Sequence, residues 1–64
     1  MLFVFDKEGY YPFWMKNTLI PLDILRLDSD YRVVDVQTAV PCRADPCKEY
    51  YPAQDARYVL ELNA

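Results

Sequence analysis

The chain has no histidine, one glycine and two cysteines among its 64 residues. Its net charge is −3, and its seven lysines and arginines are scattered. It therefore lacks the basic patch that binds nucleic acid or an anionic membrane surface. No apolar run approaches the roughly 20 residues that span a bilayer. We expect neither a nucleic-acid-binding protein nor a membrane span in this segment.

The composition is that of a small globular domain. Apolar residues make up 53% of the chain and aromatic residues 16%, which excludes a disordered or low-complexity protein. A single domain of this length buries only about 60% of its unfolded surface, so its stability is marginal. A crosslink, a metal or a second copy would add to that stability.

Local patterns predict strands and no helix. Residues 2–5 are apolar and β-prone, and residues 6–9 look like a turn in which Gly9 adopts a backbone angle that other residues disfavour. Pro12 and Pro21 push their preceding residues toward extended backbone, so residues 13–20 are predicted to be extended and irregular. Residues 57–62 alternate as a last strand.

The clearest prediction is a β-hairpin at about residues 22–40. Residues 22–27 and 31–40 are rich in aliphatic side chains, and a short polar connection joins them. In the second strand, alternation separates Val34, Val36, Thr38 and Val40 from a wetter face of Val33, Asp35, Gln37 and Ala39. The predicted fold class is mainly β, with four short strands in a small twisted antiparallel sheet or an incomplete β-barrel.

Cys42 and Cys47 lie in a proline-rich segment, residues 41–55, that is too long to be an unpinned loop in a compact domain. A disulfide would close a six-residue loop and contribute about 2 kcal/mol. Free buried thiols, or a metal or redox role, are the alternatives. The chain lacks further soft ligands for a metal, and the spacing exceeds C-x-x-C. An oxidised pair would indicate an extracytoplasmic location or the cytosol of a thermophile.

The segment Phe13–Thr18 places Trp14 beside Lys16, Asn17 and Thr18, and follows no simple period. One interpretation is a binding cluster over an aromatic platform, in which Lys16 holds an anion and Asn17 a carbonyl or amide. The other is structural. Trp14 is then a core anchor, Asn17 and Thr18 cap the backbone of a turn, and Lys16 is solvated.

Asp23 lies between two aliphatic residues and could be partly buried. It is either a candidate general base or a structural residue paired with Lys16 or Arg57. Two further segments, residues 10–12 and 50–52, combine tyrosine with proline. These tyrosines either line a groove for a peptide or sugar, or pack at a sheet edge.

Several blocks of the sequence resemble the DUF192 (UPF0127) family of small bacterial and archaeal domains: residues 1–5 (MLFVF), 13–18 (FWMKNT), 20–24 (IPLDI), 33–35 (VVD) and 57–64 (RYVLELNA). The resemblance implies a β-rich, barrel-like core and no established activity. Family members usually have an earlier strand, and a helix and closing strand after the last block. The resemblance therefore implies a shortened domain whose open sheet edges invite a homodimer.

These observations lead to two functional hypotheses. The first is a non-enzymatic binding or scaffold module that contacts an unknown protein or small ligand through Phe13–Thr18, with Trp14, Lys16, Asn17, Thr18 and Asp23 as candidate binding residues. The alternative is a small hydrolase of the cell envelope that uses Asp23 and Lys16 as an acid–base pair, which requires these side chains to converge in a pocket. The sequence predicts no cofactor and no metal.

Overall fold

A computed structural model describes residues 1–16, 18–44 and 46–64 of the chain. It contains six strands: β1 (Leu2–Gly9), β2 (Phe13–Trp14), β3 (Leu22–Leu27), β4 (Val33–Ala39), β5 (Glu49–Tyr50) and β6 (Ala56–Asn63). None of the described residues is helical, and so no helix among them could cross a membrane. The mainly β fold class predicted from the sequence is confirmed.

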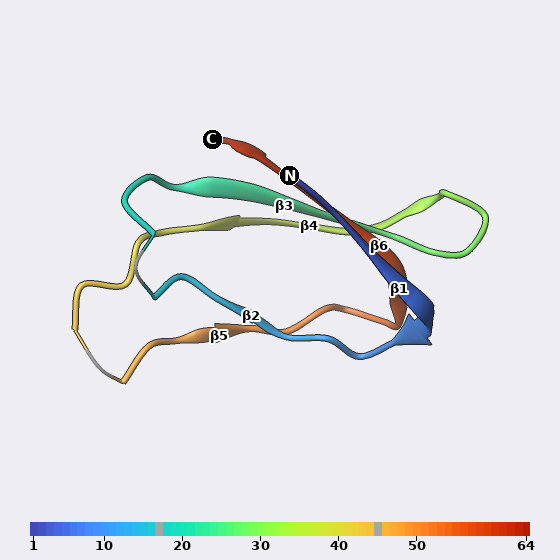
Figure 1. Cartoon of the computed structure of the whole chain (residues 1–64), viewed down its shortest axis with the longest axis horizontal. Helices are drawn as coiled ribbons and strands as arrows, with labels where there is room; N and C mark the ends of the chain where they lie inside the picture. Colours follow the sequence, from blue (N-terminus) through green and yellow to red (C-terminus); the bar gives the residue numbers. More distant parts are fainter. Residues whose placement is uncertain (17, 45) are drawn as a thin grey trace.

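The strands form two layers that are not closed into a barrel (Figure 1). The larger layer is an antiparallel sheet in the order β1-β6-β3-β4, and the smaller is the antiparallel ribbon β2–β5. The predicted hairpin is present as β3 and β4, joined through residues 28–32. The last strand, β6, pairs with both β1 and β3, so it is central in the sheet.

The predicted turn at residues 6–9 is wrong. These residues continue β1, and the register with β6 shifts between Val4, which pairs with Tyr58, and Gly9, which pairs with Ala56. The surplus residues of β1 are accommodated in a bulge. Gly9 does not have a positive φ. A Cβ atom there would lie 2.6 Å from Cζ of Tyr11, whose ring stacks on Phe5, so any other residue would require the Tyr11 ring to move.

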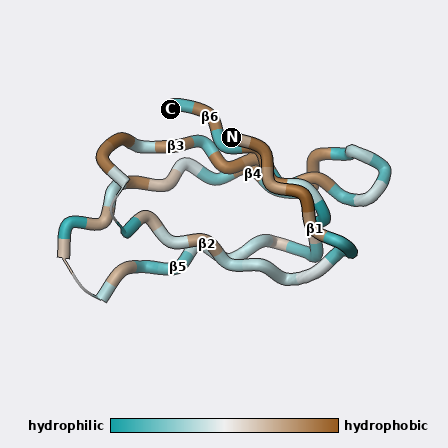
Figure 2. The backbone as a smooth tube through the Cα atoms, viewed as in Figure 1, coloured by the Kyte–Doolittle hydropathy of each residue, from teal (hydrophilic) through white to brown (hydrophobic). Residues whose placement is uncertain are grey.

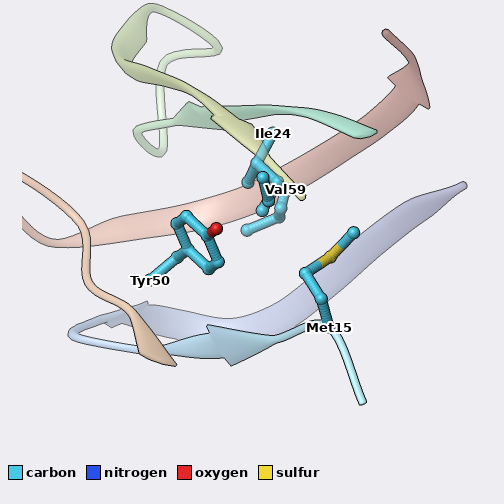
Figure 3. Close-up of a cluster of buried hydrophobic side chains, with 5 residues drawn as sticks. Met15, Ile24, Tyr50 and Val59 are labelled. Carbon is cyan, nitrogen blue, oxygen red and sulfur yellow. The ribbon is translucent and has the colours of Figure 1, made fainter. Parts of the chain in front are cut away.

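The hydrophobic core lies between the two layers (Figure 3). Ile24 and Val59 project from the four-stranded sheet, and Met15 and Tyr50 from the opposite layer; all four are at least 92% buried. Around them, Phe3 and Phe13 meet edge to face with ring centroids 5.1 Å apart. Phe13 on β2 and Tyr50 on β5 pack in this core and so hold the ribbon against the sheet.

Arg26 on β3 is fully buried beside this core. Its guanidinium donates hydrogen bonds to the Asp35 carboxylate at 3.0 Å, to Gln37 Oε1 and to the carbonyl oxygen of Tyr50 at 2.7 Å. It also lies 5.8 Å from the centre of the Phe13 ring. One arginine therefore links the sheet to the ribbon, since Asp35 and Gln37 belong to β4 and Tyr50 to β5.

This network overturns the predicted assignment of the faces of β4. Asp35, Gln37 and Ala39 face the interior, whereas Val36, Thr38 and Val40 are exposed. The register also shifts at Val34, so that Leu27 pairs with Val33 and Arg26 with Asp35. That shift breaks the strict alternation and places Val33 on the exposed face. The polar residues of β4 are inside because the buried arginine needs them as hydrogen-bond acceptors.

Candidate functional site

The side chains of β2 and the residues after it alternate between the core and the solvent. Phe13 and Met15 point inward, and Met15 is 2% exposed. Trp14 and Lys16 point outward, and Trp14 remains 58% exposed. The inward pair packs in the core, and the indole, on the other side of the strand, is exposed to solvent. Trp14 is therefore not the core anchor of the structural interpretation.

Charged groups flank the indole on this outer surface. Glu49 is the cross-strand partner of Trp14 in the β2–β5 ribbon. The ammonium group of Lys16 lies 5.5 Å from the centre of the Trp14 ring, within the range of a cation–π interaction. The backbone of Lys16 forms a parallel bridge to Cys42, which ties the segment to the cysteine loop. An aromatic plane thus has a cation on one side and a carboxylate nearby.

These residues surround an open hollow of about 540 Å³, here called the Trp14 hollow. It is lined by Pro12, Trp14, Lys16, Pro46, Cys47 and Glu49. A hollow of this volume is within the range of small-ligand sites, which are about 300–1,000 Å³. Two of its residues, Pro46 and Glu49, were not singled out from the sequence, whereas Pro12 belongs to the tyrosine–proline segment 10–12. The alternation of β5, with Tyr50 buried, would have placed Glu49 outward.

Cys42 and Cys47 are joined by a disulfide whose Cα atoms lie 5.6 Å apart. The bridge closes the loop that carries Pro46 over the Trp14 hollow, and Cys47 itself contributes to the lining. A closed loop has fewer conformations to lose, so the bridge favours a formed hollow. Among the described residues, no group of three or more histidine, cysteine, aspartate or glutamate side chains could hold a metal ion.

The structure separates the other predicted site residues. Thr18 lies outside the Trp14 hollow and lines a second hollow of about 300 Å³ with Leu19, Pro41, Cys42 and Arg43. Its amide donates to the carbonyl oxygen of Met15 at 3.1 Å. Asn17 lies outside the described residues. Of the predicted cluster, only Trp14 and Lys16 are therefore seen to share one hollow.

Asp23 lies on the outer face of β3, where its carboxylate accepts a hydrogen bond of 2.8 Å from Thr38 Oγ1. Lys16 belongs to the opposite layer and faces the Trp14 hollow. Arg57, the other suggested partner of Asp23, instead donates to the carbonyl oxygen of Phe5. The acid–base pair of the hydrolase alternative is not brought together, and nothing in this geometry supports that alternative.

The two tyrosine–proline segments contribute one exposed ring each. Tyr10 and Tyr51 stack with ring centroids 5.7 Å apart and are about half exposed, whereas Tyr50 is buried in the core. The Tyr51 hydroxyl donates to the Glu49 carboxylate at 3.3 Å. The negative charge of Glu49 is the main cause that raises the pKa of Tyr51. Glu49 thus connects the tyrosine pair to Trp14, giving an aromatic strip across the outer surface of the ribbon.

Together, the fold and this strip define a small two-layer β domain with an aromatic, charge-flanked hollow on its smaller layer. The DUF192 family, described as an uncharacterized ACR, has a model that matches residues 1–64. The chain therefore belongs to the DUF192 family, as the sequence blocks predicted. No curated protein and no solved structure matches the chain significantly.

Proposed function

We propose that this domain is a non-enzymatic binding module whose ligand packs on Trp14 in the Trp14 hollow. The observation that carries the proposal is the exposed indole on an anchored ribbon, inside a hollow of about 540 Å³. Burying a large aromatic side chain against a ligand releases its hydration water at little cost in side-chain entropy, because the ring has few rotatable bonds.

The residues that line the Trp14 hollow indicate which chemical groups its ligand carries. Trp14, Pro12 and Pro46 present apolar surface, which suits a flat apolar face such as a proline ring or one side of a sugar. Glu49 accepts hydrogen bonds and Lys16 donates them, so the ligand carries both donors and acceptors at its edges. A protein segment or a small ligand with both features fits the hollow.

Trp14 is the single tryptophan, so its fluorescence reports directly on the site. Two probes distinguish the ligand classes: a proline-rich peptide and a soluble chitin-type oligosaccharide. We expect one of them to shift the emission of Trp14 with saturation. The Lys16→Ala protein should bind that probe more weakly while keeping its far-ultraviolet circular dichroism spectrum.

The control is Leu19→Ala, which removes another exposed apolar side chain outside the hollow. It should bind the responding probe as the wild type does. A Trp14→Ala protein, followed by calorimetry because it lacks the fluorophore, should not bind. Failure of both probes to shift the emission, or undiminished binding by Trp14→Ala, would disprove the proposal.

A further inference from the structure

The disulfide Cys42–Cys47 joins the two sides of the β2–β5 ribbon near one end of the molecule. On one side, the amide of Cys42 donates to the carbonyl oxygen of Met15 at 3.3 Å, and its backbone forms the bridge to Lys16. On the other side, Cys47 lies shortly before Glu49, the first residue of β5. Figures 1 and 2 show the described parts of this loop projecting from the ribbon, with hydrophilic stretches in teal in Figure 2. The disulfide is thus a covalent tie between the loop and the continuation of β2.

This tie holds one wall of the Trp14 hollow. Pro46 and Cys47 are among the residues that line the hollow. Pro46 has no amide proton that it could donate to a neighbouring strand. Arg43, Ala44 and Pro46 are all exposed, so packing of their side chains does little to fix the loop. The position of the wall beside Trp14 therefore depends on the disulfide.

The hydrophobic core depends less on the disulfide than the hollow does. The buried core cluster consists of other residues, and Cys42 packs against it as a half-buried neighbour. The two cysteines are separated by 5 positions, and closing so short a loop restricts the unfolded chain less than closing a long one. We therefore expect cleavage of the disulfide to free the loop while the two layers stay packed.

Both cysteines border open space. Each is half-buried; Cys47 lines the Trp14 hollow, and Cys42 lines the hollow of about 300 Å³ together with Arg43. Cys42 also lines a third hollow, of about 210 Å³, together with Lys48. Disulfides that solvent can reach are the more readily reduced ones. The positive charges of Arg43 and Lys48 favour Cys42 as the sulfur that leaves as a thiolate.

We propose that the disulfide Cys42–Cys47 is a redox switch of the Trp14 hollow, which a dithiol reductant opens and thereby weakens ligand binding. The inference rests on the proposed function, because it assigns a form of regulation to the same site. It differs from a thioredoxin-like exchange catalyst, whose C-x-x-C spacing is shorter, since the disulfide is here the target of the exchange.

The reaction is thiol–disulfide exchange with a small or protein dithiol. One thiolate of the reductant attacks Sγ of Cys47 from the Trp14 hollow, the bond between the two cysteine sulfurs breaks, and Cys42 leaves as a thiolate that takes up a proton. The second thiolate of the reductant then attacks the reductant sulfur bound to Cys47, which leaves and is protonated in turn. Two electrons and two protons pass to the cysteines, and the dithiol becomes a disulfide. The charge of Lys16 offsets that of Glu49 in this hollow, so an approaching thiolate meets no net negative charge there.

Opening the disulfide changes the cost of binding. In the reduced protein, the wall formed by Pro46 and Cys47 has more conformations, and a ligand has to order it again. Ordering a loop on binding lowers affinity, so we expect the reduced protein to bind on the order of tenfold more weakly. The oxidised form is therefore the binding form, and the reduced form releases the ligand.

The test treats the oxidised protein with dithiothreitol in the absence of denaturant. Labelling with a maleimide should then find both cysteines as free thiols, while the far-ultraviolet circular dichroism spectrum is retained. The emission of Trp14 should change, because the indole loses part of the wall beside it. Calorimetry with the proline-rich peptide and with the chitin-type oligosaccharide should show binding of one of them on the order of tenfold weaker after reduction.

The matched control is the double variant Cys42→Ser/Cys47→Ser. It should bind the responding probe like the reduced wild type, and dithiothreitol should change neither its emission nor its affinity. The proposal is overturned by a disulfide that opens only in denaturant. It is equally overturned by a reduced protein or a double variant that unfolds, because the disulfide is then a staple of the fold.

The switch and the proposed function fail in different ways. If a probe binds the oxidised and the reduced protein equally well, the proposed function stands and the switch is wrong. If neither probe binds the oxidised protein, the proposed function is wrong. The response of the Trp14 emission to dithiothreitol then decides whether the disulfide controls the hollow, and an unchanged emission would overturn the switch as well.

Discussion

The inner face of the four-stranded sheet holds an arginine, an aspartate and a glutamine, whereas its outer face holds two rows of apolar side chains. One row consists of Val36, Leu25, Leu60 and Leu2, and the other of Val33, Leu27, Tyr58 and Val4. The inner face is nevertheless the one that the β2–β5 ribbon covers. Arg26 is 0% exposed, while Val36, on the outer face, is 60% exposed. Burial in this domain thus follows the position of the second layer rather than the hydrophobicity of each face.

The two faces also differ in how they are stabilised. The inner face combines close packing around Ile24 and Val59 with directional hydrogen bonds from Arg26 to two strands of different layers. Such a network fixes the position of the ribbon, because its bonds require specific geometry. On the outer face, neighbouring side chains of the sheet contact each other, Thr38 donates a hydrogen bond to Asp23, and the loop residue Tyr31 stacks on Tyr58. We therefore expect the same kind of substitution to have very different effects on the two faces.

The largest effect is expected at Arg26. Replacing it in Arg26→Met leaves Asp35 and Gln37 without their buried donor, and breaking a buried pair in this way typically costs about 3–5 kcal/mol. A domain of this size has a total stability of roughly 3–10 kcal/mol, so the variant should be partly or wholly unfolded at room temperature. Urea unfolding followed by far-ultraviolet circular dichroism measures the loss.

A combined variant tests whether the loss comes from unpaired polar groups. Arg26→Met with Asp35→Leu and Gln37→Leu makes the inner face apolar like the outer one and should recover much of the stability of the wild type. Arg43→Met, at an exposed position, is the control and should change stability by less than about 0.5 kcal/mol. A single Arg26→Met protein as stable as this control would show that the network is dispensable.

The second-largest loss of stability is expected at Val59, which we compare with Val36 in the same sheet. Val59 on the inner face is 1% exposed, and Val36 on the outer face is 60% exposed. Val59→Ala removes buried methyl groups and leaves a cavity, which should cost about 2 kcal/mol. Val36→Ala should cost less than about 0.5 kcal/mol in the monomer, since the side chain is largely hydrated.

Measuring both valine variants at low and at high protein concentration sharpens this contrast. In the dilute samples, only Val59→Ala should be destabilised. If a second copy packs on the outer face of the sheet, Val36→Ala should lose stability only in the concentrated samples, because association adds to the stability of the folded state. Equal losses in the dilute samples would mean that the outer face is already covered within one chain.

The sequence predicts strands at β1, β3, β4 and β6, but neither the short pair β2 and β5 nor which face of each strand is covered. The β3–β4 hairpin follows from two aliphatic runs around a polar connection, and β6 from its alternation. The inversion of β4 could not be predicted, because it depends on Arg26 reaching Asp35 from the neighbouring strand and Tyr50 from the other layer. The close approach of the Tyr11 ring to Gly9 could not be predicted either, because it depends on where Tyr11 packs in the folded chain.

For the candidate site, too, the local sequence pattern predicts one part and tertiary contacts determine the rest. Alternation along residues 13–16 is local, and it explains why Trp14 and Lys16 share one side of the chain. Besides Pro12, which is two residues before Trp14, the remaining lining of the Trp14 hollow comes from Pro46, Cys47 and Glu49, which lie about 30 residues further along the chain. The approach of these three residues depends on the pairing of β2 with β5 and on the disulfide, and none of the three could be assigned to the neighbourhood of Trp14 from spacing alone.

The smallest effect concerns Tyr58, on the outer face of the sheet, and Tyr31, which stacks on it. Hydrogen bonding to Tyr31 is the main cause that raises the pKa of Tyr58, and partial burial of the phenol adds to it, while Arg57 opposes it. Because the folded-state pKa lies above the unfolded value, the pair stabilises the fold below about pH 10. That contribution is lost as the pH rises through the pKa of folded Tyr58. Tyr31→Phe removes the hydrogen bond and should lower the pKa of Tyr58 toward its ordinary value.

A titration of the tyrosine ring resonances by nuclear magnetic resonance would measure this shift directly. Tyr51→Phe is the matched control, because it removes a hydroxyl from the ribbon surface and leaves the outer face intact. If the outer faces pair, the added desolvation should raise the pKa of Tyr58 further in concentrated samples of the wild type. A Tyr58 pKa that is the same in the wild type and in Tyr31→Phe would show that the Tyr31 hydroxyl does not hydrogen-bond to Tyr58.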